Sequence, residues 1–306
     1  MRDFAGRTAF VTGGANGVGL GIARQLLGEG CKVAIADIRK DSIDRALASL
    51  DNREVMGVQL DVASREGFAA AADEVEARFG PVSIVVNNAG VNLFQSIEDS
   101  SYDDWDWLLG VNLHGVINGV MTFVPRMVER VKAGTQQGGH VVNTASMASF
   151  IGSGSPGIYN TTKFAVRGLS ESLRHSLFEY GIGVSVLCPG LVKSMIYASD
   201  DVRPDALLAG AKPVDRDGVK RMENLHEVGM EPDVIGARVV EAMKANRLYI
   251  FSHPDHKEEL RTIFAEILDA YVDYPKDSGY DQRVAFENMR IERFAETRRK
   301  AREWIP

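Results

Sequence analysis

The stretch YNTTK, residues 159–163, places the phenol of Tyr159 and the ammonium group of Lys163 four residues apart. Apolar residues at positions 164, 166 and 169 predict that this stretch is helical. In a helix, side chains at positions i and i+4 share a face, so the two groups can point into one site. A nearby cation favours the phenolate, the form in which a tyrosine can act as a base. The alternative is a surface helix with an extended lysine and a half-packed tyrosine.

A glycine-rich turn near the N-terminus supplies a second candidate site. The run TGGANGVG, residues 12–19, follows one apolar run and opens a helical pattern, so its backbone N–H groups and the positive helix end could bind a pyrophosphate. Its candidate contacts are Gly13, Asn16, Gly17, Val18 and Gly19. A second apolar run ends at Asp37, which is placed to accept hydrogen bonds from an adenosine ribose diol. The alternative is that the glycines only allow close packing of a strand on a helix.

The elements that must position these residues alternate along the chain. Short β-branched runs predict strands at residues 8–12, 32–37, 55–62, 83–90, 139–146 and 183–190, and amphipathic stretches such as 20–30 and 68–80 predict helices between them. Parallel strands need such helical crossovers. The sequence therefore predicts an α/β fold: a doubly wound, Rossmann-type parallel sheet of about seven strands with helices on both faces. Two further helical patterns predict a C-terminal extension.

Composition and charge exclude several classes of protein. The chain has 306 residues, of which 45% are hydrophobic and 25% charged, and this suits a soluble globular protein. A formal net charge of −7 provides no broad positive face, so we expect neither a nucleic acid nor a membrane as partner. The N-terminal apolar clusters are too short for a signal peptide, and no run of about 18 apolar residues occurs. We therefore expect a cytoplasmic protein.

The cysteines and histidines predict no metal or redox site. Cys31 and Cys188 lie far apart in apolar surroundings and form no CxxC pair. His253 and His256 in the run SHPDH lack a third strong ligand beside Asp255. Buried, unreactive thiols and no bound metal are the expectation.

Six motifs in order give the chain a family resemblance over roughly residues 5–250. They are TGGANGVG, the pair Asp61-Val62, the run NNAG at 87–90, Asn112, Ser146 followed 13 residues later by Tyr159 with Lys163, and Pro189-Gly190 with Val192 and Ser194 beyond it. Together they resemble the short-chain dehydrogenase/reductase family. The family usually has Thr where this chain has Ser194; the hydroxyl is kept.

The resemblance implies a role for each matching residue. Tyr159 would be the base that removes the hydroxyl proton of a secondary alcohol, with its pKa lowered by Lys163 and the nicotinamide ring. Ser146 would bind the alcohol or ketone oxygen, and Asn112 would help to order a proton relay through Lys163. The cofactor would also contact Asp61, Val62, Asn88, Val192 and Ser194, besides the glycine turn, Asp37, Tyr159 and Lys163.

The choice of cofactor rests on two positions. Asp37 would bond the ribose 2′-hydroxyl of NAD and repel the 2′-phosphate of NADP, and position 16, often basic in relatives that use NADP, is Asn. We therefore expect NAD. Arg39 and Lys40 could swing toward a phosphate instead, although they also fit the polar start of the next helix.

The C-terminal part of the chain departs from the family's usual length. We expect a catalytic domain over residues 1–253, with a substrate loop at 194–230, and a helical extension over 254–306 that packs on the same domain or on a neighbouring subunit. In the first extra helix, apolar residues recur at helical spacing: Leu260, Ile263, Phe264, Ile267, Leu268 and Tyr271. This extension and several internal segments resemble bacterial Cα-dehydrogenases that oxidise the benzylic alcohol of lignin-derived β-aryl ethers.

The narrower resemblance predicts a bulky aromatic secondary alcohol as substrate and its ketone as product. Phe94, Phe150, Ile151 and the segment from Met195 could form an apolar site for an aryl ring. Another bulky alcohol, such as a steroid, a terpenoid or a polyol, is the alternative, and a non-catalytic NAD-binding regulator is a further one. Helices expected at about 104–130 and 157–180 would pair between subunits, so we expect a homodimer or homotetramer.

Overall fold

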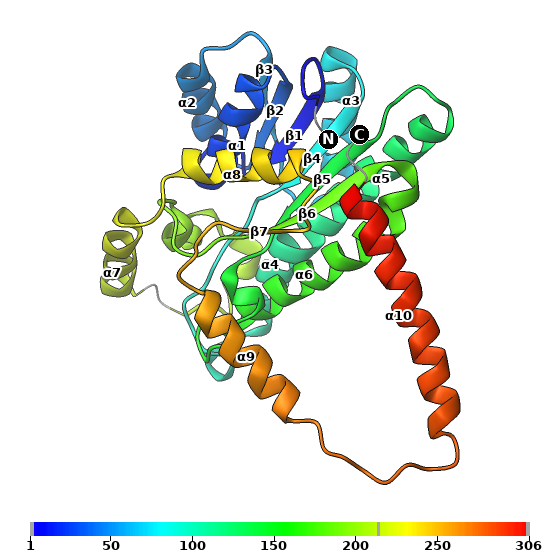
Figure 1. Cartoon of the computed structure of the whole chain (residues 1–306). Helices are drawn as coiled ribbons and strands as arrows, with labels where there is room; N and C mark the ends of the chain where they lie inside the picture. Colours follow the sequence, from blue (N-terminus) through cyan, green and yellow to red (C-terminus); the bar gives the residue numbers. More distant parts are fainter. Residues whose placement is uncertain (1–2, 213–214, 304–306) are drawn as a thin grey trace.

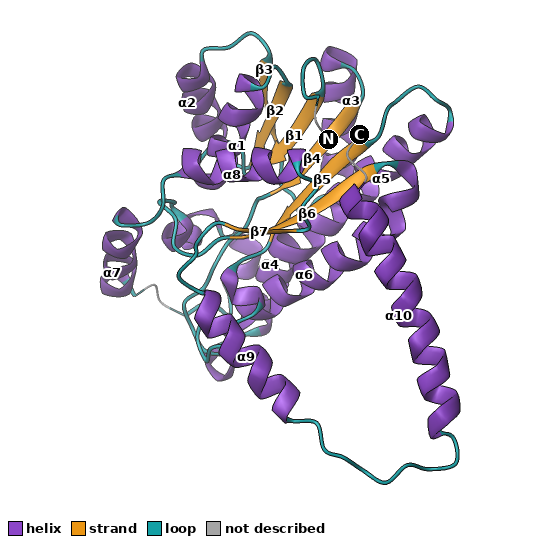
Figure 2. Ribbon diagram, viewed as in Figure 1, coloured by secondary structure: helices purple, strands orange, loops and turns teal. Residues whose placement is uncertain are grey.

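The computed structural model describes residues 3–212 and 215–303. Within these residues, seven parallel strands form one sheet in the order β3-β2-β1-β4-β5-β6-β7 (Figure 2). The strands are β1 (Thr8–Thr12), β2 (Lys32–Asp37), β3 (Val55–Gln59), β4 (Val82–Asn87), β5 (Gly139–Thr144), β6 (Ile182–Cys188) and β7 (Tyr249–Phe251). The prediction of a doubly wound parallel sheet of about seven strands is confirmed.

Four of the predicted strands end earlier in the structure than in the sequence pattern. The predicted range 83–90 ends at Asn87, and 139–146 ends at Thr144. The ranges 55–62 and 183–190 end at Gln59 and Cys188. In each case the polar or glycine residues beyond the strand form the loop at the carboxyl edge of the sheet, where ligands bind in open α/β folds.

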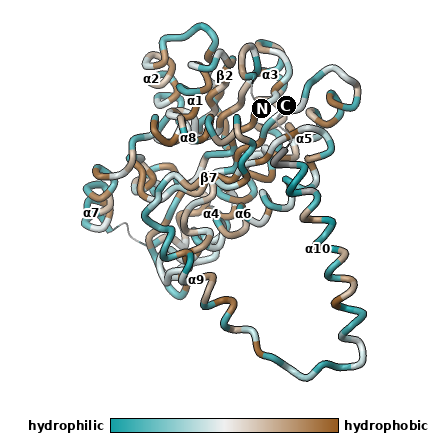
Figure 3. Tube along the Cα trace, in the orientation of Figure 1, coloured by the Kyte–Doolittle hydropathy of each residue, from teal (hydrophilic) through white to brown (hydrophobic). Residues whose placement is uncertain are grey.

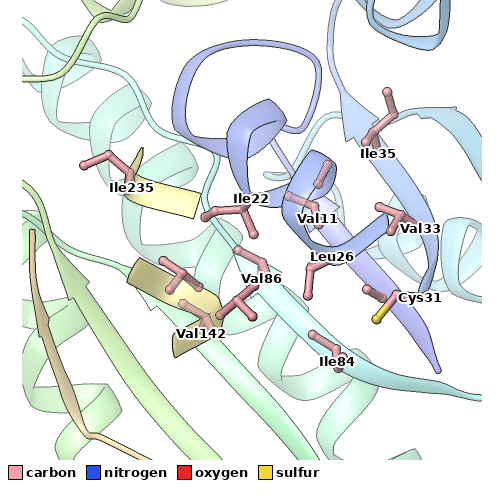
Figure 4. Packing of buried hydrophobic residues seen from close by; sticks show 14 of the residues in the cluster. Val11, Ile22, Leu26, Cys31, Val33, Ile35, Ile84, Val86, Val142 and Ile235 are labelled. Carbon is pink, nitrogen blue, oxygen red and sulfur yellow. The ribbon is translucent and has the colours of Figure 1, made fainter. Parts of the chain in front are cut away.

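Alternating side chains of the strands separate the core into two layers. On β1, Val11 packs into the layer under α1 (Gly17–Gly28), α2 (Lys40–Leu50) and α8 (Pro232–Lys244). Phe10 packs into the opposite layer, under α3 (Arg65–Phe79), α5 (Gly115–Lys132) and α6 (Gly157–Leu177). Figure 4 shows the first layer, where Ile22 and Leu26 of α1 meet Val86 and Val142 of the sheet. Both faces are thus covered, which explains why most side chains of these strands are apolar on both faces of the sheet.

A continuous helical path runs over residues 102–132. It consists of α4 (Tyr102–Leu109), one π-helical turn, η2 (Gly110–His114), and α5. Ser101 begins the path with a capping box: its side chain accepts from the Asp104 N–H, and the Asp104 carboxylate accepts from the Ser101 N–H. The path is long and apolar enough to span a membrane by composition alone, but it packs largely inside the protein, as the core helix of a soluble protein does.

The C-terminal helices stand apart from the sheet. We call residues 257–303 the C-terminal arm: α9 (Lys257–Asp269), a connecting loop, and α10 (Tyr280–Glu303). Figure 1 shows the chain after α9 running away from the body and α10 returning to it from a distance. None of the arm residues whose exposure is described is buried. Figure 3 shows apolar residues along the arm; Tyr271, expected in the first helix, lies just after its end.

The arm leaves many large apolar side chains open to solvent. Those with at least about a third of their surface exposed are Phe264, Ile267, Leu268, Tyr271, Val272, Tyr274, Val284, Phe286, Met289 and Ile291. At its two ends the arm touches the body through aromatic pairs, Phe264 with Phe150 and Phe294 with His175. The predicted range 254–306 extends to residues 304–306, which lie outside the described part of the chain.

Candidate active site

A cavity of about 600 Å³ opens at the carboxyl edge of the sheet. Every strand from β1 to β6 contributes residues from its end or from the loop that follows: Gly13, Asp37, Asp61, Asn88, Ser146 and Pro189. The order of the strands reverses beside β1, and cofactors bind at such a point in folds of this kind. The cavity therefore occupies the place that the topology predicts.

The glycine turn is built for close approach of its backbone. Gly13 and Gly17 have φ of 60° and 49°, a region that favours glycine. A Cβ on Gly13 would lie 2.9 Å from the Cα of Ala89, and one on Gly19 would lie 2.1 Å from the carbonyl oxygen of Gly13. Gly13, Asn16, Gly17 and Val18 line the cavity, whereas Gly19 supports the turn from behind.

Two polar groups at this end of the cavity are buried and, among the described residues, have no hydrogen-bond partner. They are Asn16 Nδ2 and Arg39 Nε. Both residues line the cavity, as does Asp37, whose Oδ1 accepts from the Arg39 backbone N–H at 3.2 Å. A glycine cradle with unpaired donors and a nearby carboxylate fits the pyrophosphate and ribose of a nicotinamide dinucleotide.

The loops after β3 and β4 form the remaining wall of the cavity beside the glycine turn. Asp61 and Val62 line the cavity, and the Val62 carbonyl accepts from Asn118 Nδ2 of α5 at 2.9 Å. The Asn88 side chain donates to the carbonyl oxygens of Thr12 and Gly13 at 3.1 and 3.3 Å. Asn88 therefore ties the glycine turn to the loop after β4 while it also lines the cavity.

Tyr159 and Lys163 meet on one face of α6, as the sequence predicts. Both line the cavity, and Lys163 Nζ lies 5.4 Å from the centre of the Tyr159 ring. Lys163 is 3% exposed and donates to the Thr144 carbonyl oxygen at the end of β5 (3.0 Å). Burial lowers its pKa to about 8.

The ionisation of Tyr159 differs from the expectation. Burial raises the pKa of the phenol, and a hydrogen bond with Ser146 opposes this rise. Lys163 alone therefore does not lower this pKa in the chain without its cofactor, and the lowering by Lys163 together with the nicotinamide ring stays a prediction. A further positive charge in the cavity, such as the nicotinamide ring, is needed to favour the phenolate.

Ser146 begins the short helical turn after β5. Its Oγ accepts from the Ala148 N–H at 3.2 Å and lies 3.5 Å from the Pro189 carbonyl oxygen. With its hydrogen bond to Tyr159, this places a hydroxyl and a phenol side by side on the cavity wall. Such a pair can bind one oxygen atom of a ligand from two sides.

Asn112 lies in the π-helical turn and is completely buried. Its Oδ1 accepts from the Val91 N–H at 2.8 Å, and its Nδ2 donates to the Val91 carbonyl oxygen at 2.9 Å. A Cβ on Gly90 would lie 3.3 Å from Asn112 Oδ1 and 3.4 Å from Lys163 Nζ, so both groups face the same small glycine. Asn112 thus fixes the loop after β4 beside Lys163.

The turn after β6 is held by a histidine that sequence reasoning considered only as a metal ligand. The Gly190 N–H donates to His253 Nδ1 at 3.0 Å, and His253 Nε2 lies 2.9 Å from the Leu191 carbonyl oxygen. His253 therefore clamps this turn. No group of three or more potential metal-binding side chains occurs within 3–212 and 215–303. Val192 and Ser194, which follow the turn, line the cavity.

The far end of the cavity has mainly apolar walls. Its lining includes Val91, Phe94, Trp107, Met195, Ile196, Val202, Pro204 and Leu207. Phe94 and Met195 were expected there, but Phe150 and Ile151 do not line the cavity. Phe150 packs instead against Tyr249, Phe251 and Phe264, because the turn Met147–Ser149 directs it toward β7 and α9.

A buried ion pair joins the predicted substrate loop to α4. Arg203 Nη1 lies 2.5 Å from Asp104 Oδ1, and both side chains are at most 2% exposed. Gln95 Nε2 also donates to Asp104, at 2.8 Å. Lys212 and Lys220, two further basic residues of this loop, pair with Asp99 and Glu223 on the surface. Residues 213 and 214 of the predicted loop lie outside the described residues.

Several cavity residues were not found from the sequence. Asp106 and Trp107 come from α4, His226 comes from α7 (Arg216–Glu227) within the substrate loop, and His256 directly precedes α9. The capping box at Ser101 could have located the start of α4. Nothing local indicates that His226 would bind the Val192 carbonyl oxygen, at 2.7 Å across 34 residues.

Comparison with known proteins decides the family. The short chain dehydrogenase family matches residues 7–203, well over half of the chain, and these residues include the glycine turn, Ser146, Tyr159 and Lys163. The chain belongs to the short-chain dehydrogenase family. It is therefore an oxidoreductase that uses a nicotinamide cofactor.

Three relatives of this short-chain dehydrogenase extend the comparison. The C alpha-dehydrogenase of Sphingobium sp. (strain NBRC 103272 / SYK-6) is 38% identical over 288 residues, 93% of each chain. A solved structure described as a short-chain dehydrogenase from Novosphingobium aromaticivorans is 72% identical, with a TM-score of 0.88 over 99% of this chain and 100% of the other. A short chain dehydrogenase/reductase from Burkholderia phymatum in complex with NAD is 33% identical, with a TM-score of 0.82 over 90% and 100%.

Proposed function

We propose that this enzyme catalyses the NAD-dependent oxidation of a secondary alcohol to a ketone, and that its substrate is the benzylic Cα alcohol of a lignin-derived β-aryl ether. The observation that carries the proposal is the mainly apolar end of the cavity directly beside the Ser146–Tyr159 pair. The similarity to a C alpha-dehydrogenase along nearly the whole chain supports the same substrate class.

The chain's own residues hold the reacting groups. Ser146 and Tyr159 bind the alcohol oxygen, and Tyr159 takes its proton as the carbon–hydrogen bond breaks. Lys163 stabilises the phenolate and binds the cofactor ribose, while Asn112 holds the Val91 backbone and keeps the loop beside Lys163 in place. The bound NAD supplies the hydride acceptor.

The cofactor end of the cavity favours NAD over NADP. Asp37 would accept from the ribose 2′-hydroxyl and would repel a 2′-phosphate, and Asn16 offers no positive charge. The relative with bound NAD supports this choice. Arg39 also lines the cavity, and its positive charge would favour a 2′-phosphate. The test therefore compares the two cofactors: kcat/KM with NAD+ should exceed that with NADP+. Equal or better use of NADP+ would overturn the proposal.

The substrate end offers little to an anionic substrate. Arg203 is neutralised by Asp104, and Lys212 and Lys220 pair on the surface. An uncharged aryl ring therefore fits better than a phosphate or an acyl carrier. A steroid, a terpenoid or a polyol alcohol is the alternative substrate. A regulator that binds NAD without catalysis would not need the complete set of Asn112, Ser146, Tyr159 and Lys163.

The substrate test compares kcat/KM for a guaiacylglycerol β-aryl ether with cyclohexanol, a hydroxysteroid and a sugar alcohol, following NADH at 340 nm. The aryl ether should be preferred by at least tenfold, which corresponds to about 1.4 kcal/mol of transition-state discrimination. A preference below tenfold would contradict the aryl ether as substrate, while the assignment of the enzyme as a dehydrogenase would stand.

Association and location complete the proposal. Met121 of α5 and Phe164 of α6 expose apolar surface, which supports pairing of these two helices between subunits in at least a homodimer. A homotetramer is the alternative, and a monomeric mass in light scattering at micromolar concentration would refute both.

We propose a cytoplasmic location and a single catalytic domain over 1–253. The arm, within 254–306, would lie on that domain or across a neighbouring subunit.

A further inference from the structure

One polar side chain at the substrate end of the cavity has no role so far. Asn92 lines the cavity and is only 7% exposed. Its side-chain oxygen is buried and has no hydrogen-bond partner within the described part of the chain. An unsatisfied buried amide destabilises a protein by about 1–3 kcal/mol, so such a group calls for an explanation.

The backbone around Asn92 is fixed from both sides. The preceding residue, Val91, exchanges two hydrogen bonds with Asn112, at 2.8 and 2.9 Å. The Asn92 N–H donates to Ser199 Oγ of the substrate loop at 2.9 Å, and Ser199 Oγ in turn donates to the Ile196 carbonyl oxygen at 2.7 Å. The backbone that carries the unpaired carboxamide oxygen is therefore held in place, as a binding group requires.

Asn92 and Tyr159 line the same cavity. The two chain neighbours of Asn92, Val91 and Leu93, belong to a buried cluster that Tyr159 packs against. A carboxamide in this wall would bind a polar group near the carbon that reacts, rather than the reacting oxygen itself. Since a half-turn of the side chain exchanges its oxygen and nitrogen, it can accept from a hydroxyl or donate to it.

We infer that Asn92 is a specificity-determining residue that binds the primary hydroxyl of an arylglycerol substrate, two carbons from the oxidised alcohol. This inference rests on the proposed function. In an arylglycerol β-aryl ether, the terminal CH2OH group supplies the one alcohol besides the reacting hydroxyl on the three-carbon chain. The enzyme should therefore prefer ethers that carry this group over analogues in which hydrogen replaces it.

The experiment measures kcat/KM for two compounds, a 1-aryl-2-aryloxy-1,3-propanediol and the matching 2-aryloxy-1-arylethanol. The wild-type enzyme should prefer the diol by about tenfold or more, since the site leaves Asn92 unpaired when the hydroxyl is missing. In Asn92→Leu, which has a similar volume but no amide, the preference should fall at least tenfold. Met195→Leu changes the apolar wall of the same cavity and should leave the ratio of the two values as in wild type.

The outcomes separate this inference from the proposed function. If wild type oxidises neither compound, the proposed function fails. If wild type oxidises both equally well, or Asn92→Leu keeps the wild-type ratio, the role of Asn92 is refuted while the proposed function stands. A rise in KM for NAD+ at an unchanged ratio would assign Asn92 to the cofactor instead and would equally overturn the inference. If thermal melting shows that Asn92→Leu does not fold, Asn92→Ala takes its place, and the same fall in the ratio is expected.

Discussion

Phe123 of α5 and Phe286 of α10 carry the same side chain in two long helices, yet Phe123 is completely buried and Phe286 is 62% exposed. The difference lies in what each helix meets. The apolar face of α5 packs on the sheet, whereas α10 crosses open space before it returns to the body (Figure 1). A helical pattern alone therefore does not determine burial: a second layer must be present to receive the apolar face.

The arm keeps its helices by local interactions. Ion pairs along it include Arg261 with Glu258, Arg290 with Glu287, and Lys300 with Glu296, at spacings of three or four residues. Each pair of this kind stabilises an exposed helix by only about 0.2–0.5 kcal/mol. The sheet domain instead holds its helices by burial, so changes in the two regions should have very different effects.

The largest expected effect is on kcat, which should depend on the sheet domain and not on the arm. Tyr159→Phe removes the ionisable oxygen and should lower kcat by about 10²- to 10⁴-fold, with NADH binding close to wild type. The matched control is Tyr274→Phe in the exposed loop of the arm, which should turn over normally. Initial rates and NADH titration provide the measurement. Near-normal turnover by Tyr159→Phe would show that the proton leaves by another group.

The next effect concerns stability. Phe123→Ala should lower the free energy of unfolding by about 3–5 kcal/mol, because it opens a cavity in the core. Phe286→Ala should change it by less than about 0.5 kcal/mol, as expected for an exposed position. Urea unfolding of both variants measures the difference. A loss with Phe286→Ala as large as that with Phe123→Ala would mean that another surface covers this face of α10 in solution.

Lys163 should give the sheet domain a pH dependence that the arm lacks. Burial lowers the pKa of Lys163 from 10.5 to about 8, so the unfolded chain binds this proton more tightly. The burial penalty is thus fully present below pH 8, and stability rises with pH from about 8 to 10.5. Urea unfolding of the cofactor-free protein across this range should show the stability of wild type rising relative to that of Lys163→Met.

The matched control for this pH series is Lys276→Met in the exposed loop of the arm. It should follow wild type at every pH, because the other titrating groups are shared. A parallel course for wild type and Lys163→Met would indicate that Lys163 keeps its proton in both states over this range.

The smallest effect should come from removing most of the arm. Deletion of residues 272–306 takes away no described side chain that is buried, so the melting temperature of the sheet domain should fall by only a few degrees. Calorimetry of the truncated protein tests this, and light scattering of the same sample shows whether the number of subunits changes. A large drop in melting temperature together with a smaller number of subunits would indicate that the arm joins subunits.

The strands and the glycine turn could be predicted from the sequence because their signals are local. β-branched runs determine β1 and β2, and the glycines with positive φ stand in a short segment. The seventh strand and the paired position of Tyr159 and Lys163 followed from the family resemblance and from helical spacing.

What could not be predicted depends on contacts between distant residues. Arg203 and Asp104 are 99 residues apart, and neither carries a local sign of the other. Phe150 was misplaced because one short turn after Ser146 redirects the chain toward β7. The exposure of the arm is a third case, since a helical apolar stripe predicts a buried face only where another element covers it.

The π-helical turn that carries Asn112 makes the chain one residue longer than a regular helix would need. The Gly115 N–H bonds the Gly110 carbonyl, five residues back, so the path from α4 to α5 contains an extra residue. Deleting one residue here would restore ordinary helical spacing and rotate α4 by about 100° relative to α5. Asn112 would then turn away from Val91. The extra residue that interrupts the regular helix therefore keeps Asn112 in register with the rest of the active site.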